Sequence, residues 1–216
     1  MLPPRVLGAA YSVYVRIVRL VLVEKAVPYE LEEVEVFGPD GPPSDHLLRH
    51  PFGRIPAFEH DGFWLYETGA ITRYVDEAFA GPALQPTDPA GRARMNQIIS
   101  VLDCYAYRTL VWDLFVERVR APAQGRAPDE SKIAAALRRA ETVLDALTEL
   151  MAGRPHLAGP QLTLADLHAA PMFIYARLAG EFAALLRRRP ALEAWLDRMI
   201  QRPSSAATRS PFEPAA

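Results

Sequence analysis

Two short segments of this 216-residue chain combine residue types that can hold a small peptide-like ligand. The first is Ile55-Pro56, because proline cannot donate to a sheet and the bond before it tolerates the cis form. Such a bond can turn the backbone of Ile55 outward, where it would pair with another extended peptide; a plain turn proline is the alternative. The second is Glu67-Thr68, which opens a predicted helix whose free N–H groups and dipole favour an anion. Taken alone, this pair is also explained by an ordinary N-terminal cap.

Three hydroxyl groups lie close together near the N-terminus, on Tyr11, Ser12 and Tyr14. Ser12 precedes a predicted helix, so its hydroxyl can cap that helix, stabilise a bound anion, or do both.

Metal, phosphate-loop and Ser/His/Asp sites are disfavoured. His46 and His50 have the four-residue spacing of a metal-binding pair, but the sequence offers no third ligand, so we expect no metal. The sequence contains neither a Gly-rich phosphate loop nor a Ser/His/Asp order with a supporting motif.

The segments that would position these groups begin with a strand, a helix and a second strand. Arg5–Ala9 is a short apolar run, and Tyr29–Val36 alternates charged and apolar residues with the period of a half-buried strand. Val13–Ala26 is rich in Val and Ile, which favours a strand, but its length and the spacing of its polar residues favour a helix. We predict a helix there, which lets the two strands lie parallel in one β-α-β unit.

A loop, a hairpin and a helix are expected next. Phe37–Pro43 holds two glycines and three prolines and must be a loop. Ala57–His60 and Phe63–Tyr66 flank Asp61-Gly62, a dipeptide that turns tightly because both positions tolerate positive φ. Glu67–Phe79 has the apolar spacing of a helix. Residues 1–80 are therefore predicted to form a small α/β domain.

Residues 81–90 contain three prolines and no periodic pattern, so we predict a linker there. We expect an all-helical domain over 91–203 and a loose tail over 204–216. The four predicted helices are Arg92–Arg120, Asp129–Met151, Leu164–Leu178 and Ala191–Arg202. Thr163 and Asp166 are spaced as a capping box at the start of the third helix.

Charge and cysteine content exclude several classes of function. The 24 Lys and Arg residues nearly balance 26 Asp and Glu, which removes the basic field that nucleic-acid binding requires. Cys104 is the one cysteine, so it cannot form an intramolecular disulfide, and we expect it to be a small buried apolar group. Val6–Val15 is too interrupted for a signal peptide, and no apolar stretch approaches the ~20 residues that span a bilayer. We expect a cytoplasmic protein that does not bind membranes.

Five motifs in order resemble a known family, the glutathione transferases. Four match its thioredoxin-like N-terminal domain, and the cap at Thr163 and Asp166 resembles the start of the core helix in its all-helical C-terminal domain. The four are Ser12-Val-Tyr-Val-Arg16, Glu24-Lys25, His50-Pro-Phe-Gly-Arg-Ile-Pro-Ala-Phe58 and Glu67-Thr68-Gly-Ala-Ile71. The chain is most similar to cytosolic, serine-type, bacterial-like members. The resemblance implies a detoxifying transferase that binds glutathione as co-substrate.

The resemblance also implies roles for individual residues. Ser12 matches the serine that holds the glutathione thiol as a thiolate; lowering that thiol's pKa by roughly two units requires near 2.7 kcal/mol, which one charge-assisted hydrogen bond and a helix N-terminus can supply. The glutathione-binding residues would be Arg54, Ile55, Pro56, Glu67 and Thr68, with His46 as a weak candidate for the glycyl end.

Ser12 ranks first as the thiol-stabilising residue, followed by Tyr11 and then Tyr14. A cysteine at position 12 would indicate disulfide exchange, whereas a hydroxyl indicates conjugation. The further candidates for the site of a small hydrophobic electrophile are Tyr11, Tyr14, Tyr105 and Trp112, although aromatic residues at helical spacing are more often core.

An association of two copies is also implied by the resemblance. Phe52 would insert into a partner subunit of a homodimer, and Asp103 would reach the partner's glutathione. Rival functions on the same fold are glutathione-dependent peroxide reduction, dehalogenation or isomerisation, and a binding protein that does not catalyse.

Overall fold

The computed structural model describes residues 2–214. The chain divides into two compact units: residues up to Leu84 together with the segment from Pro203 onward, and Gln85–Arg202. The predicted tail is therefore wrong as a loose segment, because it forms a short helix and belongs to the first unit. The second unit begins inside the predicted linker, at Gln85. None of the helices in the described part of the chain is long and apolar enough to cross a membrane.

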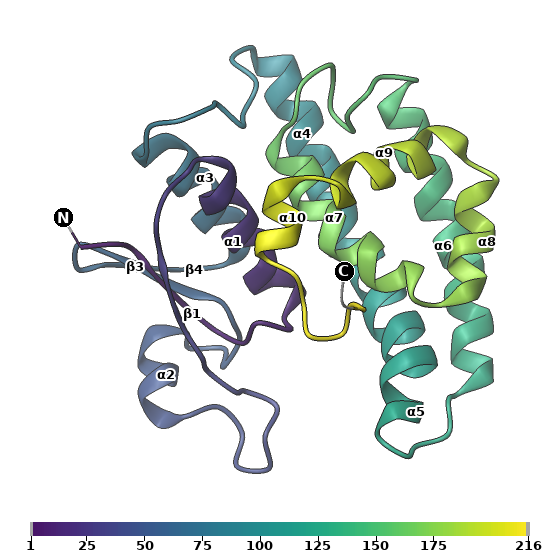
Figure 1. Ribbon diagram of the computed structural model, residues 1–216, viewed down its shortest axis with the longest axis horizontal. Helices are drawn as coiled ribbons and strands as arrows, with labels where there is room; N and C mark the ends of the chain where they lie inside the picture. Colours follow the sequence, from purple (N-terminus) through teal and green to yellow (C-terminus); the bar gives the residue numbers. More distant parts are fainter. Residues whose placement is uncertain (1, 215–216) are drawn as a thin grey trace. The chain divides into compact units, whose positions relative to one another are not determined.

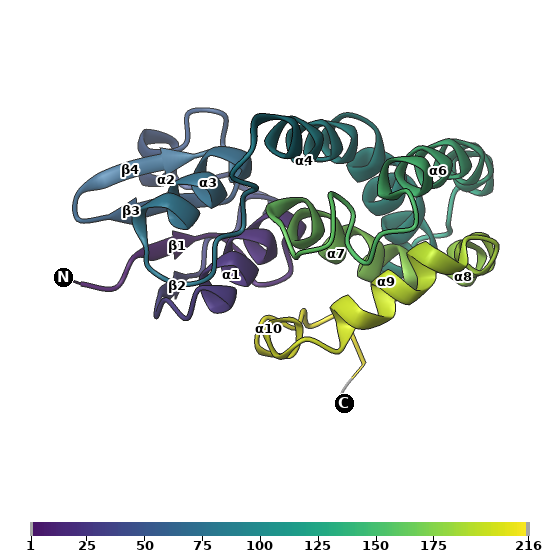
Figure 2. The ribbon, with the colours of Figure 1, turned by 90° about the horizontal axis from the view of Figure 1, so that it is seen from above.

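The first unit contains a four-stranded sheet with the strand order β2-β1-β3-β4 (Figure 2). Strand β1 pairs parallel with β2 and antiparallel with β3, which forms a hairpin with β4. The predicted β-α-β unit and the hairpin are confirmed. The strands are β1 (Arg5–Leu7), β2 (Glu30–Glu32), β3 (Ala57–His60) and β4 (Phe63–Tyr66), and the helices are α1 (Val13–Glu24), α2 (Ser44–Arg49), α3 (Thr68–Ala78) and α10 (Pro203–Ala207).

Helix α1 forms although its residues favour a strand. Eight of the twelve residues of α1 are buried, and the helix contacts α3, β1 and α10. A helix covered on several sides is apolar around most of its circumference, so its stability comes from packing and outweighs the local preference. Figures 1 and 2 show α1 between α3 and α10.

Two predictions for the first unit need correction. Strand β2 ends at Glu32, four residues before the predicted end, and Ser44–Arg49 forms α2, a helix that we did not predict. Helix α2 is six residues long, and Pro43 before it offers no side-chain cap. It therefore lacks both the length and the start signal that reveal a helix in a sequence.

The second unit is entirely helical, as predicted. Its buried centre is α7, in which every residue from Leu164 to Ala176 is buried (Figure 2). Phe173 in α7 packs edge-on against Trp195 and Phe182, with ring centroids 5.3 and 5.7 Å away. The elements are α4 (Pro89–Val101), η1 (Leu102–Arg120), α5 (Ala121–Ala123), α6 (Glu130–Met151), α7 (Leu164–Arg177), α8 (Gly180–Arg187) and α9 (Pro190–Ile200). Segment η1 continues α4 and is wound as a π-helix.

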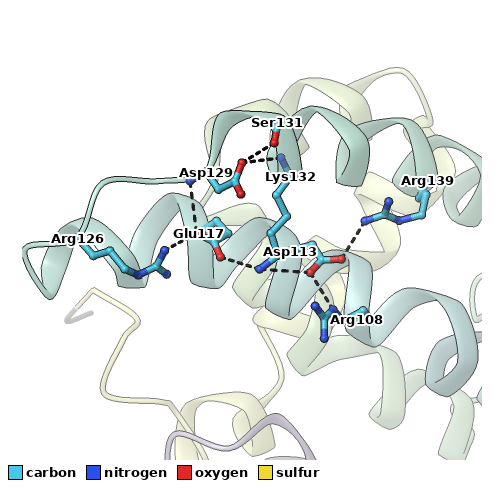
Figure 3. Close-up of polar contacts among 8 residues, drawn as sticks. All are labelled: Arg108, Asp113, Glu117, Arg126, Asp129, Ser131, Lys132 and Arg139. Carbon is cyan, nitrogen blue, oxygen red and sulfur yellow. Dashed lines mark hydrogen bonds and ion pairs between the residues drawn. The ribbon is translucent and has the colours of Figure 1, made fainter.

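Two buried carboxylates of η1 anchor α6 through ion pairs (Figure 3). Glu117 accepts hydrogen bonds from Lys132 at 2.7 Å and from Arg126 at 2.8 Å. Asp113 accepts from Arg108 at 2.8 Å and from Arg139 at 2.9 Å. Because Lys132 and Arg139 lie on α6, these contacts hold α6 and η1 together.

Glu117 makes the stability of the second unit sensitive to acid. The hydrogen bond from Lys132, followed by that from Arg126, lowers the pKa of Glu117 from 4.5 to about 2. A carboxyl whose pKa is lowered on folding stabilises the protein above its unfolded pKa and loses that contribution as the pH falls toward its folded pKa. The stabilisation should be complete above about pH 4.5 and disappear near pH 2. After allowance for solvent screening of the ion pairs of Glu117, this stabilisation amounts to about 2 kcal/mol.

The Glu117→Gln variant measures this contribution. At pH 7 its free energy of unfolding in urea should be lower than that of wild type by about 2 kcal/mol, and the difference should shrink toward zero near pH 2. The control is Glu149→Gln, since Glu149 lies exposed on α6 and its carboxylate has no partner in the described chain. A Glu117→Gln difference that stays constant with pH would contradict the assignment.

Candidate active site

The register of the sheet brings the three predicted site segments together. Leu7 at the end of β1 pairs with Ala57 at the start of β3, and Ala57 pairs on its other side with Tyr66 at the end of β4. The segments that follow Leu7, precede Ala57 and follow Tyr66 therefore leave the sheet from one row. They carry Ser12, Ile55-Pro56 and Glu67-Thr68, respectively.

Ser12 is the N-cap residue of α1, as predicted. Its hydroxyl oxygen accepts a hydrogen bond from the Val15 N–H at 3.4 Å, and the side chain is half-buried. Within the described chain the Ser12 hydroxyl donates no hydrogen bond. A donor at the positive end of a helix is suited to stabilise a bound anion.

The rival hydroxyl of Tyr11 is already engaged. It donates to the Glu35 carboxylate, with the two oxygens at 2.8 and 2.9 Å, and its ring lies 5.9 Å from that of Phe212. Donating to a bound thiolate would require Tyr11 to give up this charge-assisted bond, which makes it the weaker candidate. Tyr14 is half-buried in the first turn of α1.

Ile55 presents an unpaired peptide edge. The Ile55-Pro56 bond is cis, as predicted. The backbone N–H and C=O of Ile55 make no hydrogen bond within the described chain, although the side chain is buried. Gly8 has a φ of 154°, and a Cβ there would lie 2.5 Å from Val15 and 3.0 Å from Ile55. Glycine is thus required for the loop before Ser12 to lie against Ile55.

The Glu67-Thr68 turn has the polarity expected of an amino-acid binding site. Glu67 has φ 69° and ψ 112°, a conformation that non-glycine residues rarely adopt and that often marks a functional turn. Its exposed carboxylate has no partner in the described chain. The N–H groups of Thr68 and Gly69 and the Thr68 hydroxyl are also without acceptors there, at the start of the eleven-residue helix α3. A carboxylate next to free helix N–H groups can bind an ammonium and a carboxylate side by side.

Arg54, in the loop before β3, and His46, on α2, have different roles. Arg54 is exposed and its guanidinium has no partner in the described chain. His46 is buried, and its Nε2 lies 2.7 Å from the Arg54 carbonyl oxygen. His46 therefore holds the loop and is not available to a ligand carboxylate, which corrects its weak candidacy.

Burial, followed by the charges of His46 and Arg54, lowers the pKa of His50. Three potential metal ligands are not grouped anywhere in the described chain.

The candidates on η1 belong to the second unit. Tyr105 is 64% exposed and Trp112 is half-buried. Cys104 is exposed, so the prediction of a buried apolar cysteine is wrong. Cys104 lies on the exposed side of η1. The prediction failed because helix periodicity alone does not tell which face of a helix is covered. Asp103 lies 2.7 Å from the Nε2 of buried His168, a contact within this unit.

Two further charged residues near the site were not recognised from the sequence. Arg16, one helical turn after Ser12, is fully buried and pairs with Glu213. The two residues are 197 positions apart, and Glu213 lies in the segment we expected to be loose. No local pattern signals such a pair.

Comparison with known proteins gives a consistent result for both units. Residues 6–83 match the family model described as glutathione S-transferase, N-terminal domain, and residues 106–203 match the C-terminal domain of the same family. A glutathione S-transferase from Hyoscyamus muticus is 31% identical over 199 residues, covering 91% of this chain and 93% of the relative. One from Arabidopsis thaliana is 30% identical over 206 residues, covering 93% and 96%.

The solved structure of glutathione S-transferase III in its apo form has a TM-score of 0.87 and 29% identity, covering both chains fully. The predicted fold, a thioredoxin-like domain with an all-helical domain, is confirmed. The two curated relatives are plant proteins, so they give no support to the expected likeness to serine-type, bacterial members.

Proposed function

This chain belongs to the glutathione S-transferase family, and we propose that Ser12 holds the thiol of glutathione as a thiolate that attacks a small hydrophobic electrophile. The protein is a glutathione transferase. The observation that carries the role of Ser12 is its available hydroxyl at the N-terminus of α1, on a segment that leaves the sheet next to the one that carries Ile55.

Each part of glutathione has a matching group on the first unit. The cysteinyl backbone pairs with the N–H and C=O of Ile55, held by Pro56, as an added strand would. The γ-glutamyl carboxylate binds at the Thr68 hydroxyl and the helix N–H groups, and the γ-glutamyl ammonium binds Glu67. The exposed guanidinium of Arg54 is the partner for the glycyl carboxylate.

Ser12 then acts on the sulfur between these anchors. Its hydroxyl donates to the thiolate, while the N-terminal end of α1 adds a favourable field. A charge-assisted hydrogen bond supplies about 1.5–3 kcal/mol, enough to lower the thiol's pKa from about 8.5 to near neutrality. The thiol proton passes to solvent, and the thiolate then forms a carbon–sulfur bond while a leaving group departs with the electron pair of the bond that breaks. With an activated double bond, the displaced π pair instead takes up a proton from water. The enzyme forms no covalent intermediate. Tyr14, which lies on the same unit as Ser12, is proposed to contact the electrophile.

Thr68 tests the glutathione site independently of catalysis. Thr68→Val keeps the shape of the side chain but removes the hydroxyl, so the Kd for glutathione measured by calorimetry should rise about tenfold. Thr68→Ser restores the hydroxyl and should bind within about twofold of wild type. Equal affinities of Thr68→Val and wild type would contradict the proposed γ-glutamyl site.

We also propose that the protein forms a homodimer through Phe52. This side chain is 71% exposed and lies next to a hollow of about 580 Å³. The hollow is lined by Leu48, Arg49, Pro51, Trp64 and Tyr66. A two-fold axis would place Phe52 of each copy in the hollow of the other, because one patch then carries both the projecting ring and its socket.

Sedimentation tests this proposal. Phe52→Ala should weaken the dimer by about 2 kcal/mol, roughly a 30-fold rise in its dissociation constant, since the buried aromatic anchor is lost. Phe63→Ala is the matched control, because Phe63 is also an exposed aromatic of the first unit but does not line the hollow. Identical sedimentation of Phe52→Ala and wild type would reject the interface.

A cytoplasmic location is proposed on the basis of Cys104. Its thiol is exposed and free, which suits a reducing compartment.

A further inference from the structure

The C-terminal segment follows the whole length of α1. Figures 1 and 2 show α10 next to α1. Near the C-terminal end of α1, Ser204 donates a hydrogen bond from its hydroxyl to Glu24. In the middle, the Arg16 guanidinium donates to the Ser205 carbonyl at 3.2 Å. Arg16 and Glu24, which are eight residues apart on α1, are thus both contacted by the C-terminal segment.

The end of the segment brings a charge to the first turn of α1. The Glu213 carboxylate pairs with the fully buried guanidinium of Arg16, and its second oxygen lies 3.3 Å from the guanidinium. The Arg16 N–H also donates to the Ser12 carbonyl at 2.9 Å, the first turn of the helix. A buried cation one turn from Ser12 would favour an anion at the Ser12 hydroxyl, and Glu213 compensates that cation.

The same end also fixes the residue before Ser12. The ring of Phe212 packs against that of Tyr11, with centroids 5.9 Å apart and planes inclined by 35°. Tyr11 is in turn held by Glu35 on the other side. Tyr11, the residue before Ser12, is thus held both by Glu35, which follows β2, and by Phe212 of the C-terminal segment.

We propose that residues 210–213 are a positioning element of the thiol-activating site: Phe212 holds the Tyr11-Ser12 backbone, and Glu213 sets the net charge felt at Ser12 through Arg16. This inference rests on the proposed role of Ser12. Phe212 and Glu213 are positioning residues, since they act through Tyr11 and Arg16 and need not touch glutathione.

The two residues should shift the pH dependence of the reaction in opposite directions. In Phe212→Ala the Ser12 hydroxyl is held less well, so the acid limb of the kcat/KM profile should move to higher pH by about one unit. The loss of kcat/KM should be about threefold at pH 7 and approach about tenfold at pH values well below the acid limb. In Glu213→Gln the amide still accepts from Arg16, but the compensating negative charge is gone. The uncompensated Arg16 should move the acid limb to lower pH by about half a unit.

Two matched variants separate this role from general stabilisation. Ser204→Ala removes a contact of the same segment at the far end of α1, so it can lower the melting temperature but should leave the acid limb in place. Phe212→Leu keeps an apolar side chain against Tyr11 and should recover most of the lost activity. Titration of the bound thiolate by its ultraviolet absorbance should follow the same shifts, and it reports on the folded fraction alone.

The outcomes are distinguishable. Acid limbs and thiolate titrations of Phe212→Ala and Glu213→Gln that coincide with wild type, while Ser12→Ala is impaired, would overturn this inference and leave the role of Ser12 standing. An unimpaired Ser12→Ala would instead reject the proposed function on which the inference rests. Shifts of equal sign in both variants, or an equal shift in Ser204→Ala, would mean that the segment only stabilises the fold.

Discussion

Replacing Ser12 with alanine should lower the rate of glutathione conjugation at pH 7 by about 25-fold. Without the hydroxyl the thiol's pKa returns toward about 8.5, and the thiolate falls from most of the bound glutathione to a few per cent. The loss should shrink as the pH rises, because glutathione then ionises without help. The Kd for glutathione should change little, since Ile55, Glu67 and Thr68 still bind it. The measurement is kcat across a pH series with saturating glutathione.

Tyr11→Phe is the matched comparison for this experiment. It removes the rival hydroxyl but keeps the ring that packs against Phe212. Because the Tyr11 hydroxyl already donates to Glu35, we expect its removal to change kcat by less than about threefold. A large loss in Tyr11→Phe combined with an unchanged Ser12→Ala would transfer the thiol-stabilising role to Tyr11.

Replacing Asp166 with alanine should lower the free energy of unfolding of the second unit by about 4 kcal/mol. The Asp166 carboxylate is fully buried. It accepts from the Leu157 N–H at 2.8 Å, the Thr163 N–H at 2.9 Å and the Trp195 Nε1 at 2.9 Å, and the Thr163 hydroxyl is 3.0 Å away. Removing the carboxylate leaves these buried donors without an acceptor, and each orphaned donor is costly. Urea unfolding followed by tryptophan fluorescence measures the loss.

Two other variants define the origin of this effect. Asp166→Asn keeps one acceptor oxygen and should cost about half as much. Asp197→Ala also removes an aspartate, but the ion pair of Asp197 with Arg177 is half-exposed. This variant should therefore lower the free energy of unfolding by less than about 1 kcal/mol. Equal losses in Asp166→Ala and Asp197→Ala would show that the buried hydrogen bonds are not the cause.

The order of elements in the first unit was predictable because its signals are local. Asp61 and Gly62 adopt φ values of 49° and 83°, the positive range expected of a tight hairpin turn, and the predicted pairing of β3 with β4 is confirmed. The capping box of Thr163 and Asp166 was also predicted and is present at the start of α7, where the Thr163 hydroxyl in addition donates to the Asp166 carboxylate. Helix α2 was missed because six residues without a capping side chain carry no recognisable pattern.

The components of the candidate site were recognisable separately, but their grouping was not. Ile55-Pro56 and Glu67-Thr68 each have an ordinary structural explanation when read alone. The register Leu7–Ala57–Tyr66 places both beside the segment that carries Ser12. Which hydroxyl is available was equally hidden, because the engagement of Tyr11 depends on Glu35, a residue 24 positions away.

By itself, the sequence determined the elements that depend on neighbouring residues: turns, helix starts and a bond before Pro56 that tolerates the cis form. Tertiary structure alone decided which charges are buried together and which faces are open. Buried Arg16 is paired with Glu213 across 197 residues, and Cys104 is exposed because of how η1 packs in its unit. The physical reason is that burial and ion pairing are set by contacts between distant segments, whereas spacing along the chain reports only local geometry.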